Sequence, residues 1–347
     1  MILSLTSPQT IESIDLGTST PRLSGVIDVS RFANLVGLSA NENDIQNFIF
    51  PPNNNLEEIS LYDNKLQGSV NQYIPLDIKK ISLDNNVLTS ISSLSSNINL
   101  EDFRCSENAI TGSLPDISLN SALIIFKIYN NDLTGTIPSL SANETLEDFQ
   151  VNSNNLTGTI PNLSNNTALR IFKVGGNSNI SGSIPSLSAN TALTNFEGFF
   201  TNISGPIPSL SDNISLKGFF VSNAALTGPI PNLSFNTALV NFVAGENVLT
   251  GSIPDLSNNL SLKKFAVKNN NLTGFNGGTV SSTLLDFKAN NNNLSATAVN
   301  AILAAFVAAG SSNGILDLGG SGNAAPSGQG ITDKATLISR NWNVQTN

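Results

Sequence analysis

Histidine is absent from this chain of 347 residues, and cysteine occurs only once, at Cys105. A nucleophilic triad normally uses histidine as its base, and structural zinc sites are built from histidine and cysteine, so the sequence offers neither kind of site. A single cysteine also forms no disulfide framework. Cys105 falls on an apolar position of the repeat described below, and we expect it to be a small buried side chain.

Charged residues are scarce as well, at 12% of the chain, and the net charge is −9. Binding to a phosphate backbone requires clustered lysine and arginine, so nucleic acid is not an expected partner. No apolar run approaches the roughly 20 residues that span a bilayer, so membrane insertion is not expected either. The opening residues, MILSLTSPQTIESIDLG, lack the basic region and apolar length of a signal peptide, and any export is expected to use another route.

The chain is instead rich in one repeated pattern of apolar residues. The pattern L-x-x-L-x-L-x-x-N-x-L, with apolar substitutions, recurs at intervals of 21 to 24 residues, and a weaker copy begins at Ile11. Spacing this even is the signature of a repeat solenoid. The twelve good copies begin at Leu35, Leu56, Ile78, Leu100, Leu123, Leu146, Leu169, Leu193, Leu216, Leu239, Leu262 and Leu284.

The pattern also predicts the structure of each coil. In LEDFQVNSNNL, the side chains of Leu146, Phe149 and Val151 point to one side of a short strand. One strand cannot bury that side alone, so stacked copies are expected to form a parallel sheet over a continuous core. The asparagine after each strand is expected to bind backbone groups at the turn. This asparagine ladder comprises Asn43, Asn64, Asn86, Asn108, Asn131, Asn154, Asn177, Asn247, Asn270 and Asn292.

These repeats resemble the leucine-rich repeat family over residues 11–294. The second half of each copy, L-T-G-x-I-P-x-L-S, is similar to the plant-type subclass. The resemblance implies a horseshoe or superhelix whose parallel sheet lines the concave face. No long amphipathic run follows the proline, so the convex side is expected to be mostly extended and 3₁₀ structure. The paired cysteines that cap plant receptors are absent, which argues against a plant receptor or a secreted inhibitor.

Three parts follow from the repeat boundaries. Residues 1–34 are predicted to form an N-terminal cap with a degenerate first repeat, and residues 35–294 the array of about twelve repeats. Residues 295–347 are predicted to form a small α/β cap of helix, strand, helix and strand. Terminal coils expose their core, so a solenoid requires such caps. The first helix is indicated by one apolar face with Ser295 as N-cap and Gly310 as stop.

The C-terminal segment carries a second resemblance. It combines N-A-I-L, a G-x-L-D-L-G-G strand, a loop rich in glycine, proline and alanine, and a closing I-S-R-N-W-N-V. This combination looks like the end of virion-associated and tail-associated proteins of bacteriophages, some of which carry leucine-rich repeats. The resemblance implies a virion or extracellular-surface location, with a bacterial host surface as the target.

Adjacent carboxylates are the remaining route to catalysis. Three such pairs occur, and because each lies at a strand entry its two members should point to opposite faces of the sheet. A bare sheet also has no cleft that would raise the pKa of one acid. We therefore predict a non-enzymatic protein without cofactor or metal. The pairs are Glu57/Glu58, Glu101/Asp102 and Glu147/Asp148.

A ligand is expected to contact the residues that alternate with the core positions of the strands. What we call the middle row lies four residues after each repeat start: Ser39, Ser60, Ser82, Arg104, Lys127, Gln150, Lys173, Glu197, Phe220, Val243, Ala266 and Lys288. What we call the flanking row lies two residues later: Asn41, Tyr62, Asp84, Ser106, Tyr129, Asn152, Gly175, Phe199, Ser222, Gly245, Lys268 and Asn290. Our candidate binding residues are the basic and aromatic members Tyr62, Arg104, Lys127, Tyr129, Lys173, Phe199 and Phe220.

The stretch FEGFFTNI raises a particular question about direction. Strict alternation predicts that Phe200 points inward and fills the space left by Gly198. Phe199 and Phe220 are then expected to face outward on neighbouring coils, within reach of each other. The asparagine ladder lapses in the same two coils. Two outward rings indicate a binding patch; the alternative is a local register shift that buries both rings, and Tyr129 has the alternative of being an ordinary exposed side chain.

Two functions fit these observations. The first is a recognition module that binds a protein or glycan on a bacterial host surface as part of a virion. The second is a structural protein of a virion or cell surface, contacting other virion proteins, with no ligand on the concave face. Fold alone does not choose between them. An aromatic and basic patch favours recognition, whereas a uniform surface of serine, asparagine and threonine favours the structural role.

Overall fold

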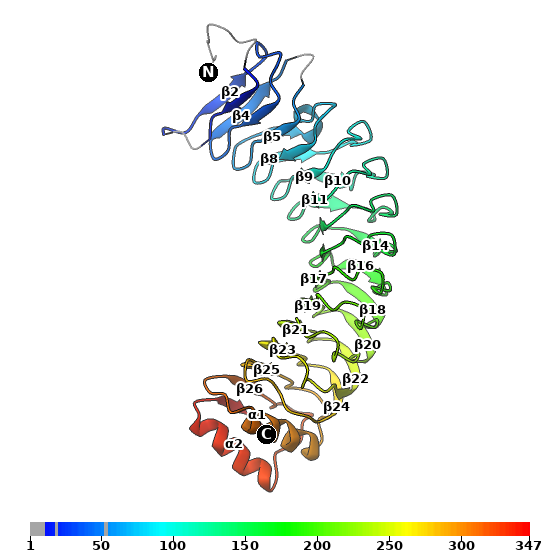
Figure 1. Ribbon diagram of the computed structural model, residues 1–347, viewed down its shortest axis with the longest axis vertical. Helices are drawn as coiled ribbons and strands as arrows, with labels where there is room; N and C mark the ends of the chain where they lie inside the picture. The colour runs from blue at the N-terminus through cyan, green and yellow to red at the C-terminus, as the bar shows by residue number, and fades with distance from the viewer. Residues whose placement is uncertain (1–10, 18–19, 52–54) are drawn as a thin grey trace. The chain divides into compact units, whose positions relative to one another are not determined.

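A computed structural model describes residues 11–17, 20–51 and 55–347 of the chain (Figure 1). The described chain divides into two compact units, Met1–Thr157 and Gly158–Asn347, and each is described here by itself. In both units every repeat is one coil that contributes a short strand to a parallel main sheet. The repeat solenoid predicted from the spacing of the apolar residues is therefore confirmed.

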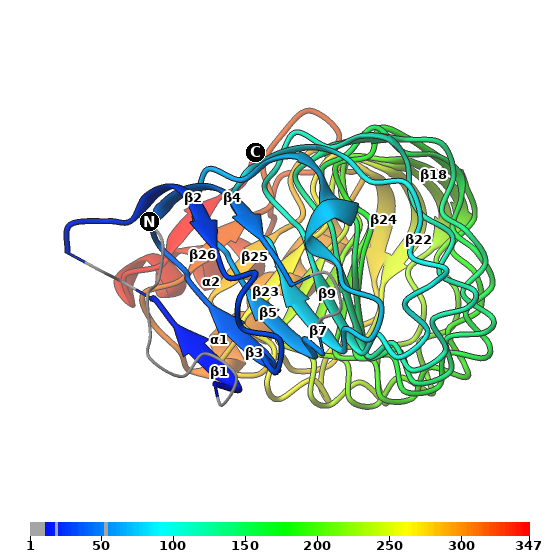
Figure 2. The same cartoon turned by 90° about the horizontal axis from the view of Figure 1, so that it is seen from above.

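In the first unit the main-sheet strands are three residues long and follow one another in chain order. Figure 2 shows β1, β3, β5 and β7 of this sheet side by side. Equivalent residues pair from coil to coil, so that Leu38 lies opposite Ile59 and Ile59 opposite Ile81. The strands are β1 (Ser13–Asp15), β3 (Gly37–Ser39), β5 (Glu58–Ser60), β7 (Lys80–Ser82), β9 (Asp102–Arg104), β11 (Ile125–Lys127) and β13 (Asp148–Gln150).

The second unit continues the same pattern in its own coils. Phe196 pairs with Phe172 and Phe219, so the phenylalanines at the middle of these strands lie in register. The strands are β15 (Ile171–Lys173), β17 (Asn195–Glu197), β19 (Gly218–Phe220), β21 (Asn241–Val243), β23 (Lys264–Ala266), β25 (Asp286–Lys288), β26 (Ile315–Asp317) and β27 (Asn343–Gln345).

Every described coil of the array except the last, which continues into a helix, also forms a second strand, which we did not expect from the sequence. We predicted mostly extended and 3₁₀ structure after the asparagine, and one 3₁₀ helix is present, η2 (Val70–Tyr73). Most L-T-G segments instead pair with the same segment of the next coil, and β2 (Ser24–Asp28) pairs with β4 (Asp44–Ile49). The other second strands are β6 (Gln67–Ser69), β8 (Val87–Ser90), β10 (Thr111–Ser113), β12 (Asp132–Thr134), β14 (Thr157–Thr159), β16 (Asn179–Gly182), β18 (Asn202–Pro206), β20 (Ala225–Pro229), β22 (Val248–Ile253) and β24 (Asn271–Phe275).

The core of the later coils is a stack of phenylalanine rings. In the first unit Phe103, Phe126 and Phe149 stack with centroids 5.4 and 5.6 Å apart. In the second unit the rings of successive coils stack at 5.3 to 5.8 Å. Because the coil spacing is set by the sheet, identical residues at one position meet face to face, and these rings are nearly inaccessible to solvent. The stack of the second unit comprises Phe172, Phe196, Phe219, Phe242, Phe265 and Phe287.

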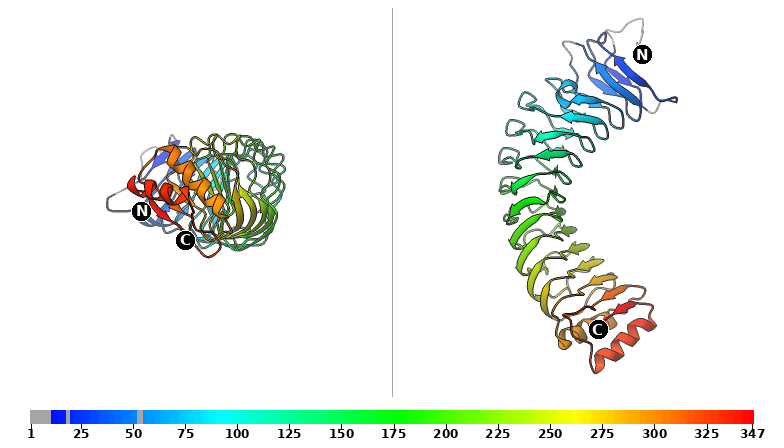
Figure 3. Two further views of the ribbon diagram at one scale, coloured as in Figure 1. Left: turned by 90° about the horizontal axis from the view of Figure 1, so that it is seen from below. Right: turned by 180° about the vertical axis from the view of Figure 1, so that it is seen from behind.

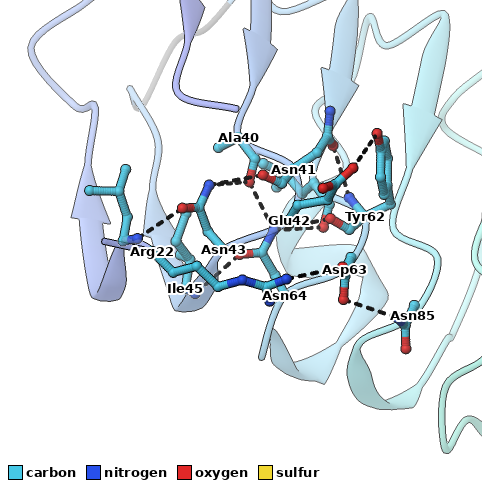
Figure 4. Close-up of polar contacts among 12 residues, drawn as sticks. Arg22, Ala40, Asn41, Glu42, Asn43, Ile45, Tyr62, Asp63, Asn64 and Asn85 are labelled. Carbon is cyan, nitrogen blue, oxygen red and sulfur yellow. Dashed lines mark hydrogen bonds and ion pairs between the residues drawn. The ribbon is translucent and has the colours of Figure 1, made fainter. Parts of the chain in front are cut away.

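The asparagine ladder ties neighbouring coils together in the coils that carry it. Asn131 donates through its amide nitrogen to the carbonyl oxygens of Cys105 and Ile128, at 3.0 and 3.3 Å, and its amide oxygen accepts from Ile110 N at 3.0 Å. Figure 4 shows the same arrangement where Asn43 and Asn64 both donate to the Ala40 carbonyl. Each side chain thus satisfies backbone groups of two coils that have no partner in the sheet.

A second ladder of buried asparagines lies on the returning loop of each coil. Asn213 donates to the carbonyl oxygens of Leu187 and Asn190, both at 2.9 Å, and its own carbonyl accepts from Asn236 at 3.0 Å. Asn213 and Asn236 thus each donate a hydrogen bond to the backbone carbonyl of the preceding asparagine in this ladder. Its members within the described coils are Asn97, Asn120, Asn143, Asn166, Asn190, Asn213, Asn236 and Asn259.

Two helices close the end of the second unit. Figure 3 shows α1 (Ala296–Ala309) and α2 (Gln329–Ser339) lying over the last coils. The Ser295 hydroxyl caps α1 by accepting from Ala298 N, and Gly310 ends it in a left-handed conformation. The ring of Phe306 meets Phe287 edge-on at 5.3 Å, and Trp342 in turn meets Phe306 edge-on at 5.2 Å. The ring stack therefore ends beneath a tryptophan rather than at solvent.

Candidate functional site

The open face of the main sheet in the first unit is hollowed into a groove of about 470 Å³. Its floor is formed by three serines of the middle row, Ser39, Ser60 and Ser82, which lie opposite one another on β3, β5 and β7. The floor is low because serine is small, while larger residues stand on either side. The volume falls within the range of about 300–1,000 Å³ that is usual for ligand sites.

Two of the three serine hydroxyls of the floor already donate a hydrogen bond, and the third, Ser39, accepts one from the amide nitrogen of Asn41 at 3.2 Å. Ser60 donates to the amide oxygen of Asn41 at 2.9 Å, and Ser82 donates to the carboxylate of Asp84 at 3.2 Å. A hydroxyl that has donated its hydrogen keeps its oxygen lone pairs as acceptors. Much of the floor therefore favours ligand groups that donate hydrogen bonds.

One wall of the groove carries an aromatic ring. Tyr62 is 38% exposed, and its hydroxyl lies 3.5 Å from the carboxylate of Glu42 (Figure 4). The backbone of the same residue is fixed to the preceding coil, because Tyr62 N donates a hydrogen bond to Asn41 Oδ1 at 3.1 Å. A ring fixed at its base and exposed along its face is suited to contact a ligand, since it offers apolar area with a polar tip.

The opposite wall and the end of the groove carry charges that neutralise each other. Lys80 pairs with Glu58 at 2.8 Å across neighbouring strands. Arg104 binds Asp102 of its own strand with two hydrogen bonds, both of 2.9 Å. These side chains line the groove as compensated pairs, so they present little net charge to a ligand.

Asp84 differs from these charges. Its carboxylate lines the groove between Tyr62 and Ser106 in the flanking row, and it forms no ion pair with any residue that the structure describes. Burial raises the pKa of the Asp84 carboxyl, an effect that hydrogen bonds from Ser106 and Ser82 and the charge of Arg104 only partly offset. Asp84 is therefore the one acid among the described residues of the groove that forms no ion pair, and its neighbours compensate its charge only in part.

The raised pKa leads to a testable consequence for stability. The folded state holds the proton of Asp84 more tightly than the unfolded chain does. Ionisation of this group therefore lowers stability as the pH rises from the pKa of the unfolded chain through that of the folded protein. Asp84→Asn is expected to stabilise the first unit relative to the wild type at about pH 7, and this advantage should vanish at about pH 3, where both states are protonated. Urea unfolding of both proteins at the two pH values measures the difference; an advantage that does not grow with pH would contradict the assignment.

The three basic candidates are all engaged by carboxylates. Besides the Arg104 pair, Lys127 pairs with Asp148 at 2.8 Å and Lys173 pairs with Glu197 at 3.0 Å. In both lysine pairs the acid comes from the strand of the next coil. We predicted that these residues offer positive charge to a ligand, whereas the structure shows that each of them is paired with a carboxylate of the open face.

The aromatic candidates Phe199 and Phe220 lie on the open face and are half-buried. Phe220 stays in register between Glu197 and Val243, so the alternative of a register shift is wrong. Each ring lies over a glycine: that of Phe199 over Gly175, and that of Phe220 over Gly218. Glycine permits this close approach because it has no side chain.

The expectation that Phe200 points inward is also wrong. Phe200 is 59% exposed and has φ of 51°, and its ring meets Phe199 edge-on at 5.8 Å. Among the described rings, that of Phe199 therefore contacts Phe200 rather than Phe220. The space beside Gly198 is taken by Ile203 and Phe196 instead. The aromatic surface of the second unit is thus larger than predicted, though differently composed.

Tyr129 is half-buried in the flanking row, two coils beyond Asp84. Burial, followed by the charge of Asp84, raises the pKa of its hydroxyl. In the order of the coils, Tyr62 lies one coil before Asp84 and Tyr129 two coils after it.

Within the described ranges, no group of three or more acidic or cysteine side chains is arranged to hold a metal ion. Neither described helix has the length and apolar character needed to cross a lipid bilayer.

No protein-family model matches the sequence, and no curated protein matches it at a significant level. Solved structures do match. The crystal structure of PEPR1–AtPEP1 matches with a TM-score of 0.76 and 22% identity, over 94% of this chain and 50% of that chain. A leucine-rich repeat protein of Leptospira interrogans matches with a TM-score of 0.63 and 19% identity, over 92% of this chain and 79% of that one. The chain has the leucine-rich repeat fold.

A third similar structure is that of the plant peptide hormone receptor RGFR1 in complex with RGF2. It matches with a TM-score of 0.71 and 23% identity, over 98% of this chain and 62% of that chain. This chain thus spans between half and two thirds of the length of the PEPR1 and RGFR1 chains. At these identities the likeness establishes the leucine-rich repeat fold and leaves the function to the site.

Asp84 was not among the candidate binding residues that we predicted from the sequence. Asp84 is the one acidic member of the flanking row, and that singularity was visible in the sequence. The serine floor was visible too, as three consecutive serines of the middle row. The pairing of the surrounding charges was not visible in the sequence. That pairing leaves Asp84 without an ion pair among the described residues.

Proposed function

We propose that this chain is a non-enzymatic recognition module that binds a peptide or protein ligand in the serine-floored groove of the first unit. The observation that carries the proposal is the groove itself, about 470 Å³ in volume, on the open face of a leucine-rich repeat sheet. Rigid walls support it further, since a preorganised surface loses little entropy on binding. RGFR1, which has the same fold, is a peptide hormone receptor solved in complex with RGF2.

A bacteriophage virion is the setting that we propose for this module, with a protein or glycan of the bacterial surface as the target. The support is the resemblance of residues 295–347 to virion-associated proteins. The competing proposal is a structural protein of a virion or cell surface with an unoccupied open face. The two differ in one observable property, which is saturable binding at the groove.

Filling the groove tests the proposal. Ser60→Trp places a large side chain on the middle of the floor and is expected to weaken binding by more than about a hundredfold, because a clash excludes the ligand. Ser96→Trp is the matched control, since Ser96 is exposed on a loop outside the main sheet. Binding is measured against whole bacterial cells, a glycan array and an array of random heptapeptides, using the full chain.

The outcomes separate the proposals. Binding that is lost in Ser60→Trp and kept in Ser96→Trp supports recognition at the groove. Binding that survives Ser60→Trp but is lost in Phe199→Ala/Phe220→Ala overturns the groove and moves the site to the aromatic surface of the second unit. Saturable binding to none of the three probes overturns recognition and favours the structural role.

A further inference from the structure

Asp84 performs a structural task that does not require its charge. Asp84 Oδ1 accepts a hydrogen bond from Ser106 N at 2.7 Å, and Oδ2 accepts from Ser82 at 3.2 Å. Asn41 holds the equivalent position two coils earlier: its amide oxygen accepts from Tyr62 N at 3.1 Å, and its amide nitrogen donates to the hydroxyl of Ser39 in its own coil at 3.2 Å. A neutral amide therefore satisfies this position of the coil.

The carboxylate at this position is moreover costly to the fold. It is partly removed from water, and it forms no ion pair with a described residue, whereas Lys80 and Arg104 in the same groove are both paired. Its hydrogen bonds and the charge of Arg104 compensate this desolvation only in part, and a desolvated charge is stabilised further when an opposite charge pairs with it. The missing partner of Asp84 is a cation, and the whole chain, at a net charge of −9, would attract one.

The surroundings of Asp84 match a cationic side chain. Tyr62 stands beside it in the flanking row, and an aromatic face next to a carboxylate attracts an ammonium or guanidinium group. The hydroxyl oxygens of Ser60 and Ser82, which donate their hydrogens elsewhere, keep lone pairs that can accept the remaining hydrogens of such a group. The charged part of the ligand would therefore meet a negative charge, a ring and acceptors at one place.

We propose that Asp84 binds the lysine or arginine side chain of an extended peptide that lies in the groove across β3, β5 and β7. The inference rests on the proposed function of the groove. The groove spans five neighbouring strands, from β1 to β9. At about 4.8 Å per strand this distance accommodates an extended segment of about six residues.

A polymer of amino sugars fits the same site less well. Such a polymer would carry further ammonium groups along the groove, where the other two acids, Glu58 and Asp102, are already paired with Lys80 and Arg104. A peptide can place a single basic residue at Asp84 and neutral residues elsewhere. The distribution of charge along the groove, with one acid that forms no ion pair among the described residues, therefore favours the peptide.

Asp84→Asn isolates the charge, because Asn41 shows that asparagine keeps the hydrogen bonds. The matched control is Asp116→Asn: Asp116 is exposed on another side of the coil, and its carboxylate likewise accepts from a backbone N–H, that of Ser118, at 2.9 Å. The wild-type chain is expected to select, from an array of random heptapeptides, sequences that share one lysine or arginine. Asp84→Asn is expected to bind those peptides at least about tenfold more weakly, and Asp116→Asn as tightly as the wild type.

Salt provides an independent measurement on the same peptides. Added sodium chloride should weaken binding to the wild type more than to Asp84→Asn, because only the wild type contributes the ionic contact. Circular dichroism melts of both variants confirm that each is folded. A charge-reversed protein, Asp84→Lys, is expected to prefer the same peptides with glutamate in place of the basic residue.

Selected peptides without a shared basic residue would overturn the inference, as would equal affinity of the wild type and Asp84→Asn. Tighter binding to glucosamine oligomers than to any peptide would also overturn it, assigning Asp84 to a sugar amine. The proposed function is judged separately by Ser60→Trp. If that variant loses binding and Asp84→Asn does not, the groove stands and the role of Asp84 falls; if Ser60→Trp keeps binding, the groove falls and Asp84 with it.

Discussion

Replacing Phe219 by alanine is expected to destabilise the second unit by about 3–5 kcal/mol. Phe219 is fully buried in the middle of the ring stack, with its centroid 5.3 Å from that of Phe196 and 5.7 Å from that of Phe242. Alanine would leave a cavity that the neighbouring coils cannot close, because the sheet fixes their spacing. Both adjacent stacking contacts would be lost together.

Hydrogen exchange locates this loss as well as measuring it. A coil contacts mainly its neighbours, so protection should fall most in β17, β19 and β21 and least in β27. Phe219→Leu is the control, since it keeps most of the apolar volume and should cost clearly less than alanine. A loss below about 1 kcal/mol for Phe219→Ala would mean that the stack contributes little to stability.

The solenoid was predictable because one short period determines nearly every coil. A spacing of 21 to 24 residues with apolar side chains at fixed positions leaves few arrangements other than stacked strands. Alternation within the strand also assigned the faces correctly for Phe149, which is buried, and for Ser60, which lines the groove.

The second asparagine ladder was harder to recognise, although its pattern repeats as plainly as the first. In N-E-T-L, Asn143 precedes the repeat start Leu146 by three residues, and Asn166 and Leu169 have the same spacing. Asparagine in a loop normally indicates an exposed turn. Only the stacking of the loops themselves buries it, and that burial depends on contacts between coils rather than on local sequence.

The wrong prediction for the direction of Phe200 has a simple physical origin. Alternation was extended to Phe200, three residues beyond the end of β17, where the backbone has already turned. Other coils place residues such as Asp63, Asn130 and Glu246 at the equivalent position with φ between 51° and 56°. The face of a side chain follows from alternation only while the strand lasts.

The ion pairs escaped prediction for a related reason. Lys127 was considered within its own row, whereas its partner Asp148 stands at the first position of the next strand, diagonal to it. Rows drawn along the solenoid miss such diagonal contacts, which long lysine side chains readily make. Knowing the register between coils would have revealed them, and with them the isolation of Asp84.

Replacing Trp342 by alanine is expected to cost about 3–5 kcal/mol, but at the end of the second unit rather than in its middle. Trp342 is 3% exposed, covers the ring of Phe306 and donates from Nε1 to the Ser311 carbonyl at 2.9 Å. Trp342→Phe keeps a ring in place and loses that hydrogen bond. It should therefore lower the free energy of unfolding by about 1 kcal/mol.

The two alanine substitutions should therefore remove similar free energies with different patterns of exchange. Trp342→Ala should expose the amides of α1, β26 and β27 while those of β17 and β19 stay protected, because an end coil has one neighbour to affect. Trp342 is the only tryptophan of the chain, so its fluorescence reports the cap alone in the wild type. If the cap is the weaker end, this fluorescence should change at lower urea than the circular dichroism of the whole chain. Coincident transitions, together with uniform loss of protection in Trp342→Ala, would instead mean that the cap and the repeats of the second unit unfold as one cooperative body.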